Sequence, residues 1–197
     1  QLSQVQNFIA SGVDALVVTA VSAAATPQMT KMANAAGIPI VYVNRMPADS
    51  ASLGGTSTFV GSNETWSGTL AAFELCNLAG GAGNAVMLQG ILSNEAAITR
   101  SKDFEEVLAL SMCNGITLEA VEVGSWQRSK GNDIVSNWLS SGMEIDIVFA
   151  NNDEMGLGAV QAFKNAGISM DDVLIGSVDA TADALASMAA GELDVTV

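Results

Sequence analysis

One stretch decides the fold: Ile145-Asp-Ile-Val-Phe-Ala-Asn-Asn-Asp-Glu-Met-Gly-Leu-Gly-Ala-Val-Gln-Ala-Phe163. Its opening residues are mostly apolar and predict a buried strand that ends at Ala150. A polar corner, Asn151 to Asp153, comes next, and the apolar side chains after it have the spacing of an amphipathic helix. Strand, polar corner and helix make up half of a βαβ unit. Open sheets built from such units bind ligands at the carboxyl ends of their strands.

The same alternation of strand and helix recurs along the chain. Most predicted strands are near-continuous apolar runs, which is typical of a parallel sheet covered by helices on both faces. We therefore predict an α/β fold with doubly wound parallel sheets. Further strands are predicted at residues 15–18, 38–43, 58–61, 84–88, 116–123 and 173–178, and another begins at 195. Helices are predicted at residues 2–10, 23–36, 64–78, 94–111, 128–139 and 182–190, besides the one after the corner.

The composition excludes several classes of function. The chain has 197 residues, a net charge of −14 and only seven Lys and Arg residues, which argues against binding nucleic acid or an anionic membrane surface. It contains no histidine, so Ser-His-Asp triads, histidine-based zinc sites and imidazole acid–base catalysis are absent. No segment reaches the roughly 18 apolar residues of a membrane span. We therefore expect no nucleic-acid partner and no direct insertion into a membrane.

Enzyme motifs are also weak. The carboxylates of Glu95, Asp153 and Glu154 have no spacing that fixes a catalytic pair. The glycine-rich segment 80–83 precedes a strand rather than following one, so we interpret it as a turn and not as a dinucleotide loop. We expect no catalytic residue, no cofactor and no metal ion.

The cysteines and the chain ends give less definite information. Cys76 and Cys113 lie far apart and fit no CxxC pattern. The simpler interpretation is two small thiols in the core or on the surface; the alternative is a disulfide, which needs an oxidising compartment. The chain starts within a predicted helix without an initiator Met, ends within a predicted strand, and shows no signal-peptide pattern. We interpret it as an interior piece of a longer protein.

Polar and aromatic residues gather at the predicted carboxyl ends of the strands. Such a set suits a neutral polyol: a carboxylate accepts from vicinal hydroxyls, an arginine donates in a planar fork, and an asparagine does both. An aromatic ring can cover the apolar C–H face of a sugar. Arg100 lies in the helix that follows another of these strands. The residues at the strand ends are Asn44, Arg45, Gln89, Trp126, Asn151, Asn152 and Asp179.

Each of these residues also has a purely structural interpretation. Asp153 is the preferred candidate for capping the helix after the corner, and Asn152 and Asp179 could also cap helices. The arginines at 45 and 100 could form surface ion pairs, and the tryptophan at 126 could pack under a loop. Trp66 and Trp138 sit within predicted helices and are interpreted as packing residues of the core or the surface, and Arg128 as solvated.

Eight segments along nearly the whole chain carry a resemblance to a known family: Gly12–Val18, Ala35–Ile40, Tyr42–Arg45, Val60–Asn63, Ala97–Arg100, Trp126–Gly131, Phe149–Met155 and Val178–Asp179. Taken as a set, they resemble the sugar-binding periplasmic proteins of ABC transporters, of the ribose- and inositol-binding type. The family's ribose binders usually carry Asp at the position of Asn44, an aromatic that is often Phe at Trp126, and another aromatic at Val178. The Asn-Arg pair together with Trp126 looks more like the inositol or rhizopine branch.

The resemblance implies a two-lobed type I periplasmic-binding-protein fold that is truncated at both ends. Residues 1–62 would belong to the first lobe and residues 63–197 to the second. Asn44 and Arg45 would reach the sugar from the first lobe, and Ser62 would lie near the site at the lobe crossing. From the second lobe, Arg100, Asn152 and Asp179 would hydrogen-bond the sugar, Trp126 would stack on it, and Ile91 and Val178 would line the pocket.

The expected function is capture of a monosaccharide or cyclitol between the lobes for uptake by an ABC transporter. The expected partners are the sugar or cyclitol and the permease of the transporter, and the protein would be a monomer. It would work in the periplasm, or outside the cell on a lipid anchor. The alternative is the effector-binding domain of a sugar-responsive transcriptional repressor of the same fold. An upstream helix-turn-helix would decide for the repressor, and a signal peptide would decide for the carrier.

Overall fold

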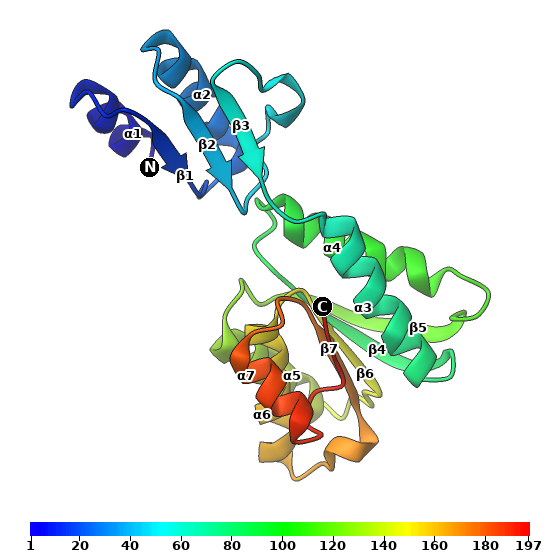
Figure 1. Ribbon diagram of the computed structural model, residues 1–197. Helices are drawn as coiled ribbons and strands as arrows, with labels where there is room; N and C mark the ends of the chain where they lie inside the picture. The colour runs from blue at the N-terminus through cyan, green and yellow to red at the C-terminus, as the bar shows by residue number, and fades with distance from the viewer. The chain divides into compact units, whose positions relative to one another are not determined.

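The computed structural model describes all residues, 1–197, and shows two compact units (Figure 1). Unit 1 comprises Gln1–Asn63 and Ser93–Ala96, and unit 2 comprises Glu64–Leu92 and Ala97–Val197. The longest helix has 15 residues, and none of the helices combines the length and apolar character needed to cross a bilayer.

Unit 1 contains a three-stranded parallel sheet in the order β1-β2-β3. Val5, Leu16, Met29 and Tyr42 belong to one core in which α1 and α2 cover the same face of this sheet. Val17, which points to the other face, is 73% exposed. Coverage by helices on both faces therefore does not extend to this unit. Its elements are α1 (Leu2–Ala10), β1 (Leu16–Val18), α2 (Thr26–Ala35), β2 (Ile40–Val43) and β3 (Ser57–Val60), with short 3₁₀ turns at Ala23–Ala25 and Ser50–Ser52.

Unit 2 contains a five-stranded parallel sheet in the order β5-β4-β6-β7-β8. The chain enters at β4, adds β5 on one side, and then builds β6, β7 and β8 on the other. The strand order therefore reverses between β4 and β6, and ligands of open α/β sheets bind at such switch points. The strands are β4 (Ala82–Gln89), β5 (Gly115–Val123), β6 (Ile147–Ala150), β7 (Leu174–Ser177) and β8 (Val195–Thr196).

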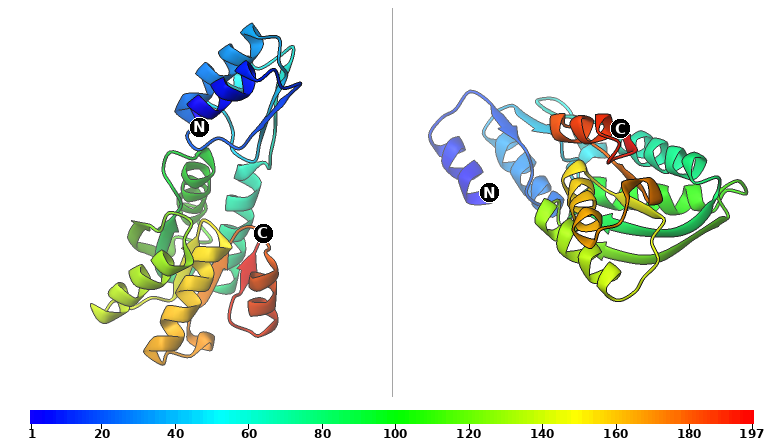
Figure 2. Two further views of the ribbon diagram at one scale, coloured as in Figure 1. Left: turned by 90° about the vertical axis from the view of Figure 1, so that its left-hand side faces the viewer. Right: turned by 90° about the horizontal axis from the view of Figure 1, so that it is seen from below.

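Helices cover both faces of this second sheet. Alternate strand residues point to opposite faces, as the pleat of a strand requires. Val86 and Val148 pack with α5, α6 and α7, whereas Met87 and Phe149 pack with α3 and α4. Figures 1 and 2 show α5, α6 and α7 side by side on one face. The helices are α3 (Glu64–Leu78), α4 (Glu95–Leu108, which belongs to unit 2 from Ala97 on), α5 (Arg128–Ser140), α6 (Asp153–Ala166) and α7 (Ala182–Ala189), with a 3₁₀ turn at Met170–Asp172.

Cys76 and Cys113 form a disulfide, so the simpler interpretation of two separate thiols is wrong. Cys76 lies in the last turn of α3, shortly before β4, and Cys113 lies just before β5. Because β4 and β5 are parallel neighbours, their starting ends lie at the same edge of the sheet. The topology therefore brings together two residues that are 37 positions apart in the sequence.

Candidate functional site

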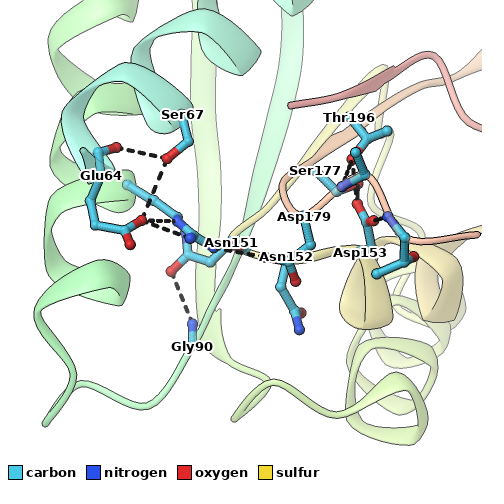
Figure 3. A network of polar contacts seen from close by, with 12 residues as sticks. Glu64, Ser67, Gly90, Asn151, Asn152, Asp153, Ser177, Asp179 and Thr196 are labelled. Atoms are coloured by element: carbon cyan, nitrogen blue, oxygen red, sulfur yellow. Dashed lines mark hydrogen bonds and ion pairs between the residues drawn. The ribbon is translucent and has the colours of Figure 1, made fainter. Parts of the chain in front are cut away.

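The carboxyl edge of the unit 2 sheet is held together at the switch point between β4 and β6. The backbone N–H of Gly90, which follows β4, donates to Oδ1 of Asn151, which follows β6, at 2.9 Å (Figure 3). The hydroxyl of Ser101 donates to the same oxygen at 3.2 Å. Asn151 is fully buried, and its amide nitrogen has no hydrogen-bond partner. Its side chain therefore joins the two loops and α4 from within the protein.

Arg100 of α4 is the cation of this edge and is buried, with 8% exposure. Its Nε donates to Oε2 of Glu64 at 2.8 Å, and its Nη2 lies 2.7 Å from the same oxygen. Its Nη1 donates to the backbone oxygen of Asn151 at 2.6 Å. A surface ion pair is thus the wrong description of Arg100, because its partner Glu64 is also buried, with 7% exposure.

The approach of α4 to α3 depends on Gly68. A Cβ atom at this position would lie 2.8 Å from the Cα atom of Arg100 and 2.6 Å from Oδ2 of Asp103. Glu64 lies four residues before Gly68, on the same face of α3. Because Gly68 has no side chain, the backbone of α4 can approach α3 closely. The carboxylate of Glu64, one turn before Gly68, then contacts the guanidinium of Arg100.

Trp126 lies in the turn between β5 and α5. Ser125 and Trp126 both have positive φ, 54° and 67°, and each such residue costs on the order of 1–3 kcal/mol in strain. The backbone N–H groups of Gly124 and Ser125 both donate to the backbone oxygen of Gln89, which holds the turn against the end of β4. The indole then occupies the space beside Gly90. A Cβ atom added to Gly90 would lie 2.1 Å from Cζ2 of Trp126.

The turn brings the indole next to the buried arginine. Cζ of Arg100 lies 5.9 Å from the centroid of the Trp126 ring, within the range of a cation–π contact. The half-buried ring belongs to the polar edge as well as to the packing beneath it. It can offer an apolar face to a ligand that also needs hydrogen bonds.

Asp179 follows β7 and completes this group, with 42% of its side chain exposed. Its Oδ1 lies 3.7 Å from Nη1 of Arg100, beyond hydrogen-bond distance. Burial raises the pKa of Asp179 to about 6; Arg100 opposes that shift, and the charges of Asp153, Glu64 and Glu154 add to it. Asp179 does not cap α7, because Thr181 does so. The carboxylate has accepting capacity that its protein partners leave unused.

The residues of the corner after β6 have different roles from those predicted. Asn152, not Asp153, caps α6, because its Oδ1 accepts from the N–H of Met155 at 3.1 Å. Asp153 is fully buried and accepts from the hydroxyl of Ser177, the hydroxyl of Thr196 and the N–H of Thr181 (Figure 3). It ties α6 to β7, β8 and the start of α7. The amide nitrogen of Asn152 is not used in capping.

Arg128 is not simply solvated, as the sequence predicted, because it forms ion pairs with two carboxylates. It donates from Nε and Nη2 to the two carboxylate oxygens of Glu154, at 3.0 and 2.8 Å, and from Nη2 to Asp183 at 2.8 Å. These carboxylates raise the pKa of Arg128. The bridge fixes the starts of α5, α6 and α7 relative to one another. The prediction missed these ion pairs because they join residues that are far apart in the sequence.

Two apolar residues predicted for the pocket have different environments. Ile91, in the loop after β4, is 38% exposed. Val178 is 2% exposed and packs in the core with Phe149 and Val195. Val178 thus supports the edge from below.

The predicted residues of unit 1 lie at its own strand ends. Asn44 directly follows β2, is exposed, and has a φ of 67°. Arg45 is half-buried, and its Nη1 donates to the backbone oxygen of Ala20 at 3.1 Å. Ser62 is exposed in the segment after β3. Nothing in unit 1 covers the amide of Asn44 or the hydroxyl of Ser62.

The structure thus gathers Arg100, Trp126 and Asp179 within unit 2, with Asn152 at the neighbouring corner. The prediction missed Glu64 and Gly90, and left Asn151 undecided. A Glu that opens a helix directly after a polar loop was the available signal for Glu64, but that signal is shared with ordinary helix starts. No group of three or more His, Cys, Asp or Glu side chains is placed to hold a metal ion.

Comparisons with known proteins agree with this architecture. The family model described as "Periplasmic binding protein domain" matches residues 1–197, so by its description the family is one of binding proteins. A protein of Rhizobium meliloti named "Putative rhizopine-binding protein" is 55% identical over 197 residues. The match covers 100% of this chain and 64% of that protein, so this chain spans less than two thirds of its relative's length.

Solved structures of ABC transporter proteins are also similar. A solute binding protein from Bacillus halodurans C-125 with bound myo-inositol superposes with a TM-score of 0.92 at 38% identity, covering 100% of this chain and 66% of that one. The periplasmic binding protein component of the arabinose ABC transporter from Shewanella sp. ANA-3, bound to L-arabinofuranose, superposes with a TM-score of 0.91 at 34% identity. That match covers 100% of this chain and 65% of that one.

Proposed function

The chain belongs to the periplasmic binding protein domain family, and on this premise we propose that the full-length protein captures a monosaccharide or cyclitol for uptake by an ABC transporter. One observation carries the proposal: a buried guanidinium, a half-exposed carboxylate and an indole ring lie together at the switch point of the unit 2 sheet. A polyol ring needs donors, an acceptor and an apolar surface, and this group supplies all three.

The proposed contacts follow from that chemistry. Arg100 would donate to ring hydroxyls, Asp179 would accept from them, Asn152 would donate through its amide nitrogen, and Trp126 would cover the apolar face of the ring. Ile91 would bound the apolar side of the pocket directly, and Val178 would line it only from beneath, because its side chain is packed in the core. We also propose that residues 1–62 and 63–197 belong to the first and second lobes implied by the resemblance. Asn44, Arg45 and Ser62 would be the first lobe's contributions.

The proposed protein is a carrier and not an enzyme. The matched family and the relatives named above are binding proteins, which favours a carrier over a repressor's effector-binding domain. We propose that it works in the periplasm, as a monomer, and delivers its ligand to a membrane permease. The disulfide between Cys76 and Cys113 is consistent with an oxidising compartment.

The function is tested on the full-length protein in two steps. A thermal-shift panel of pentoses, hexoses and inositols, with myo-inositol as the first member, identifies a ligand that raises the unfolding temperature. Calorimetry then compares wild type with Asp179→Ala. We expect the affinity to fall at least about tenfold, or roughly 1.4 kcal/mol.

The control for this experiment is Asp133→Ala, which removes an exposed carboxylate from α5. We expect its affinity to equal that of wild type. An unchanged affinity in Asp179→Ala would remove Asp179 from the site, and a panel without any stabilising polyol would contradict the carrier function.

A further inference from the structure

We propose that Glu64 is a positioning residue of the binding site: it holds the guanidinium of Arg100 toward the ligand and away from Asp179. This inference rests on the proposed function, because it assigns a role within the same site. Glu64 would not touch the ligand. It would decide instead which groups of its neighbours remain available to the ligand.

The contacts of Arg100 show how the positioning works. A guanidinium has five N–H donors, of which three point at protein oxygens here: Nε–H and one Nη2–H at Glu64, and one Nη1–H at Asn151. The two remaining N–H groups would serve ligand hydroxyls, and one of them belongs to Nη1, which lies 3.7 Å from Oδ1 of Asp179. Planar contacts of this kind fix the orientation of a guanidinium as well as its position. Arg100 therefore presents a fixed pair of donors.

The carboxylate of Glu64 is itself held in place. It lies at the first residue of α3, and the hydroxyl of Ser67 donates to its backbone oxygen at 3.0 Å and approaches Oε2 at 3.4 Å. Both partners of the ion pair are nearly excluded from water, with side-chain exposures of 10% for Arg100 and 7% for Glu64. Figure 3 shows Glu64 and Ser67 next to Asn151, at the switch point.

Asp179 is the competing partner for Arg100. Its Oδ1 forms a long ion pair with Nη1 at 3.7 Å, so a small movement of the guanidinium would convert this contact into a hydrogen-bonded ion pair. Such a pair would occupy the carboxylate oxygens that the proposed function reserves for ligand hydroxyls. Glu64 would prevent this by keeping Arg100 on its own side, because movement of the guanidinium away from Glu64 would leave a buried carboxylate without a compensating charge.

The charged groups around Asp179 make the effect measurable. Arg100 of α4 lowers the pKa of Asp179, whereas burial and the carboxylates of Asp153 and Glu154 of α6 and Glu64 of α3 raise it. Replacing Glu64 by a neutral residue removes one raising charge and frees Arg100 to move toward Asp179. Both changes lower the pKa of Asp179, a response that loss of packing alone would not produce.

The experiment compares Glu64→Gln with wild type in the full-length protein. Carboxyl NMR follows the titration of Asp179, with Asp179→Asn identifying the signal. We expect the pKa to fall from about 6 toward the usual 3.8. Calorimetry at pH 7.5 with myo-inositol as the probe is expected to show at least about a tenfold loss of affinity, because the donors of Arg100 would no longer be held toward the ligand.

The matched control is Glu106→Gln, which also neutralises a glutamate in an ion pair with a neighbouring cation. Its partner is Lys102, and both side chains are exposed on α4, with exposures of 67% for Lys102 and 62% for Glu106. We expect neither the pKa of Asp179 nor the affinity to change in this variant. An unchanged titration of Asp179 in folded Glu64→Gln would overturn the proposal.

Two further outcomes remain decisive. If Glu64→Gln does not fold, Glu64→Asp keeps the buried charge but shortens its reach; we expect weaker contact with Arg100, a lower pKa of Asp179 and a several-fold loss of affinity. No change in either quantity would overturn the proposal. If wild type binds neither myo-inositol nor another polyol, the proposed function fails, whereas the titration still tests the role of Glu64 by itself.

Discussion

Asp179 has a backbone φ of 124°, in a region that residues other than glycine seldom adopt. Its carboxyl therefore occupies an unfavourable backbone position in addition to a partly desolvated environment. Burial raises its pKa to about 6, against a usual value of 3.8 that the unfolded chain retains. The folded state thus binds this proton more tightly than the unfolded state. The resulting stabilisation is fully present below pH 3.8 and is lost as the pH rises through about 6.

This linkage predicts that Asp179→Asn stabilises the protein at neutral pH. Asparagine has a similar shape and carries no charge to desolvate. We expect a higher unfolding temperature than wild type at pH 7.5, and a difference that vanishes toward pH 4. Thermal unfolding of the full-length protein at both pH values measures it. The exposed Asp133→Asn should show no such pH-dependent gain, and a destabilised Asp179→Asn at pH 7.5 would contradict the prediction.

Asn152 combines a capping oxygen with an amide that is proposed to contact the ligand, and two substitutions separate these roles. Serine caps helices about as well as asparagine, whereas alanine costs about 1 kcal/mol. We expect Asn152→Ser to retain the stability of wild type and Asn152→Ala to lose about that amount in urea unfolding. Both variants should bind the ligand more weakly in calorimetry. Wild-type affinity in Asn152→Ser would leave Asn152 as a cap alone.

The pair of helices α3 and α4 positions the site through a close backbone approach. Gly68 allows that approach, and Arg100 extends from the part of α4 that lies against it. A hydrophobic pattern predicts both helices but not their separation, because separation depends on which residues face each other. The packing of α3 against α4 thus affects ligand binding by placing Arg100, rather than through direct contact with the ligand.

Gly68→Ala tests this packing. The added Cβ would meet the Cα atom of Arg100 at 2.8 Å, and a backbone atom cannot move aside cheaply. We expect a loss of about 1–3 kcal/mol in the free energy of unfolding, even though alanine favours helices by about 1 kcal/mol over glycine. Ligand affinity should fall as well. Gly54→Ala is the matched control, since no atom lies within 4 Å of its added Cβ, and equal stability of the two variants would contradict the prediction.

Apolar periodicity predicted the elements themselves well. The helix at 64–78 has the predicted bounds, and the order of strands and helices agrees throughout. The helix predicted at 94–111 instead ends at Leu108, because the following residues turn to bring Cys113 to Cys76. That correction depends on a contact between distant parts of the chain, which periodicity does not encode.

Site residues at or near the ends of predicted strands could be identified from the sequence. Residues whose roles depend on tertiary contacts could not. Arg100, Trp126 and Asp179 were selected for their residue types and positions, and the structure brings them together. Glu64 was missed because it meets Arg100 across 36 positions of sequence. The capping role was given to Asp153 because a local pattern cannot show that Ser177 and Thr196 already claim its carboxylate.

The disulfide is a constraint on unit 2 as a whole. It closes a loop with a sequence separation of 37, for which loop-closure entropy gives a stabilisation of about 4 kcal/mol. We expect the Cys76→Ser, Cys113→Ser double variant to lose roughly 2–5 kcal/mol in chemical denaturation. Wild type treated with a reductant should approach the stability of that variant. Equal stability of oxidised wild type and double variant would contradict the prediction.

Cys76 and Cys113 lie at the edge of the sheet where β4 and β5 begin, whereas Trp126 and Asp179 follow strands at the edge where they end. A mutation in the loops at the second edge leaves the covalent bond at the first untouched. Descendants of this chain could therefore exchange residues after the strands and acquire a different ligand without losing the cross-link that keeps the fold intact. Changes in ligand specificity and the maintenance of the fold would therefore depend on opposite edges of the same sheet.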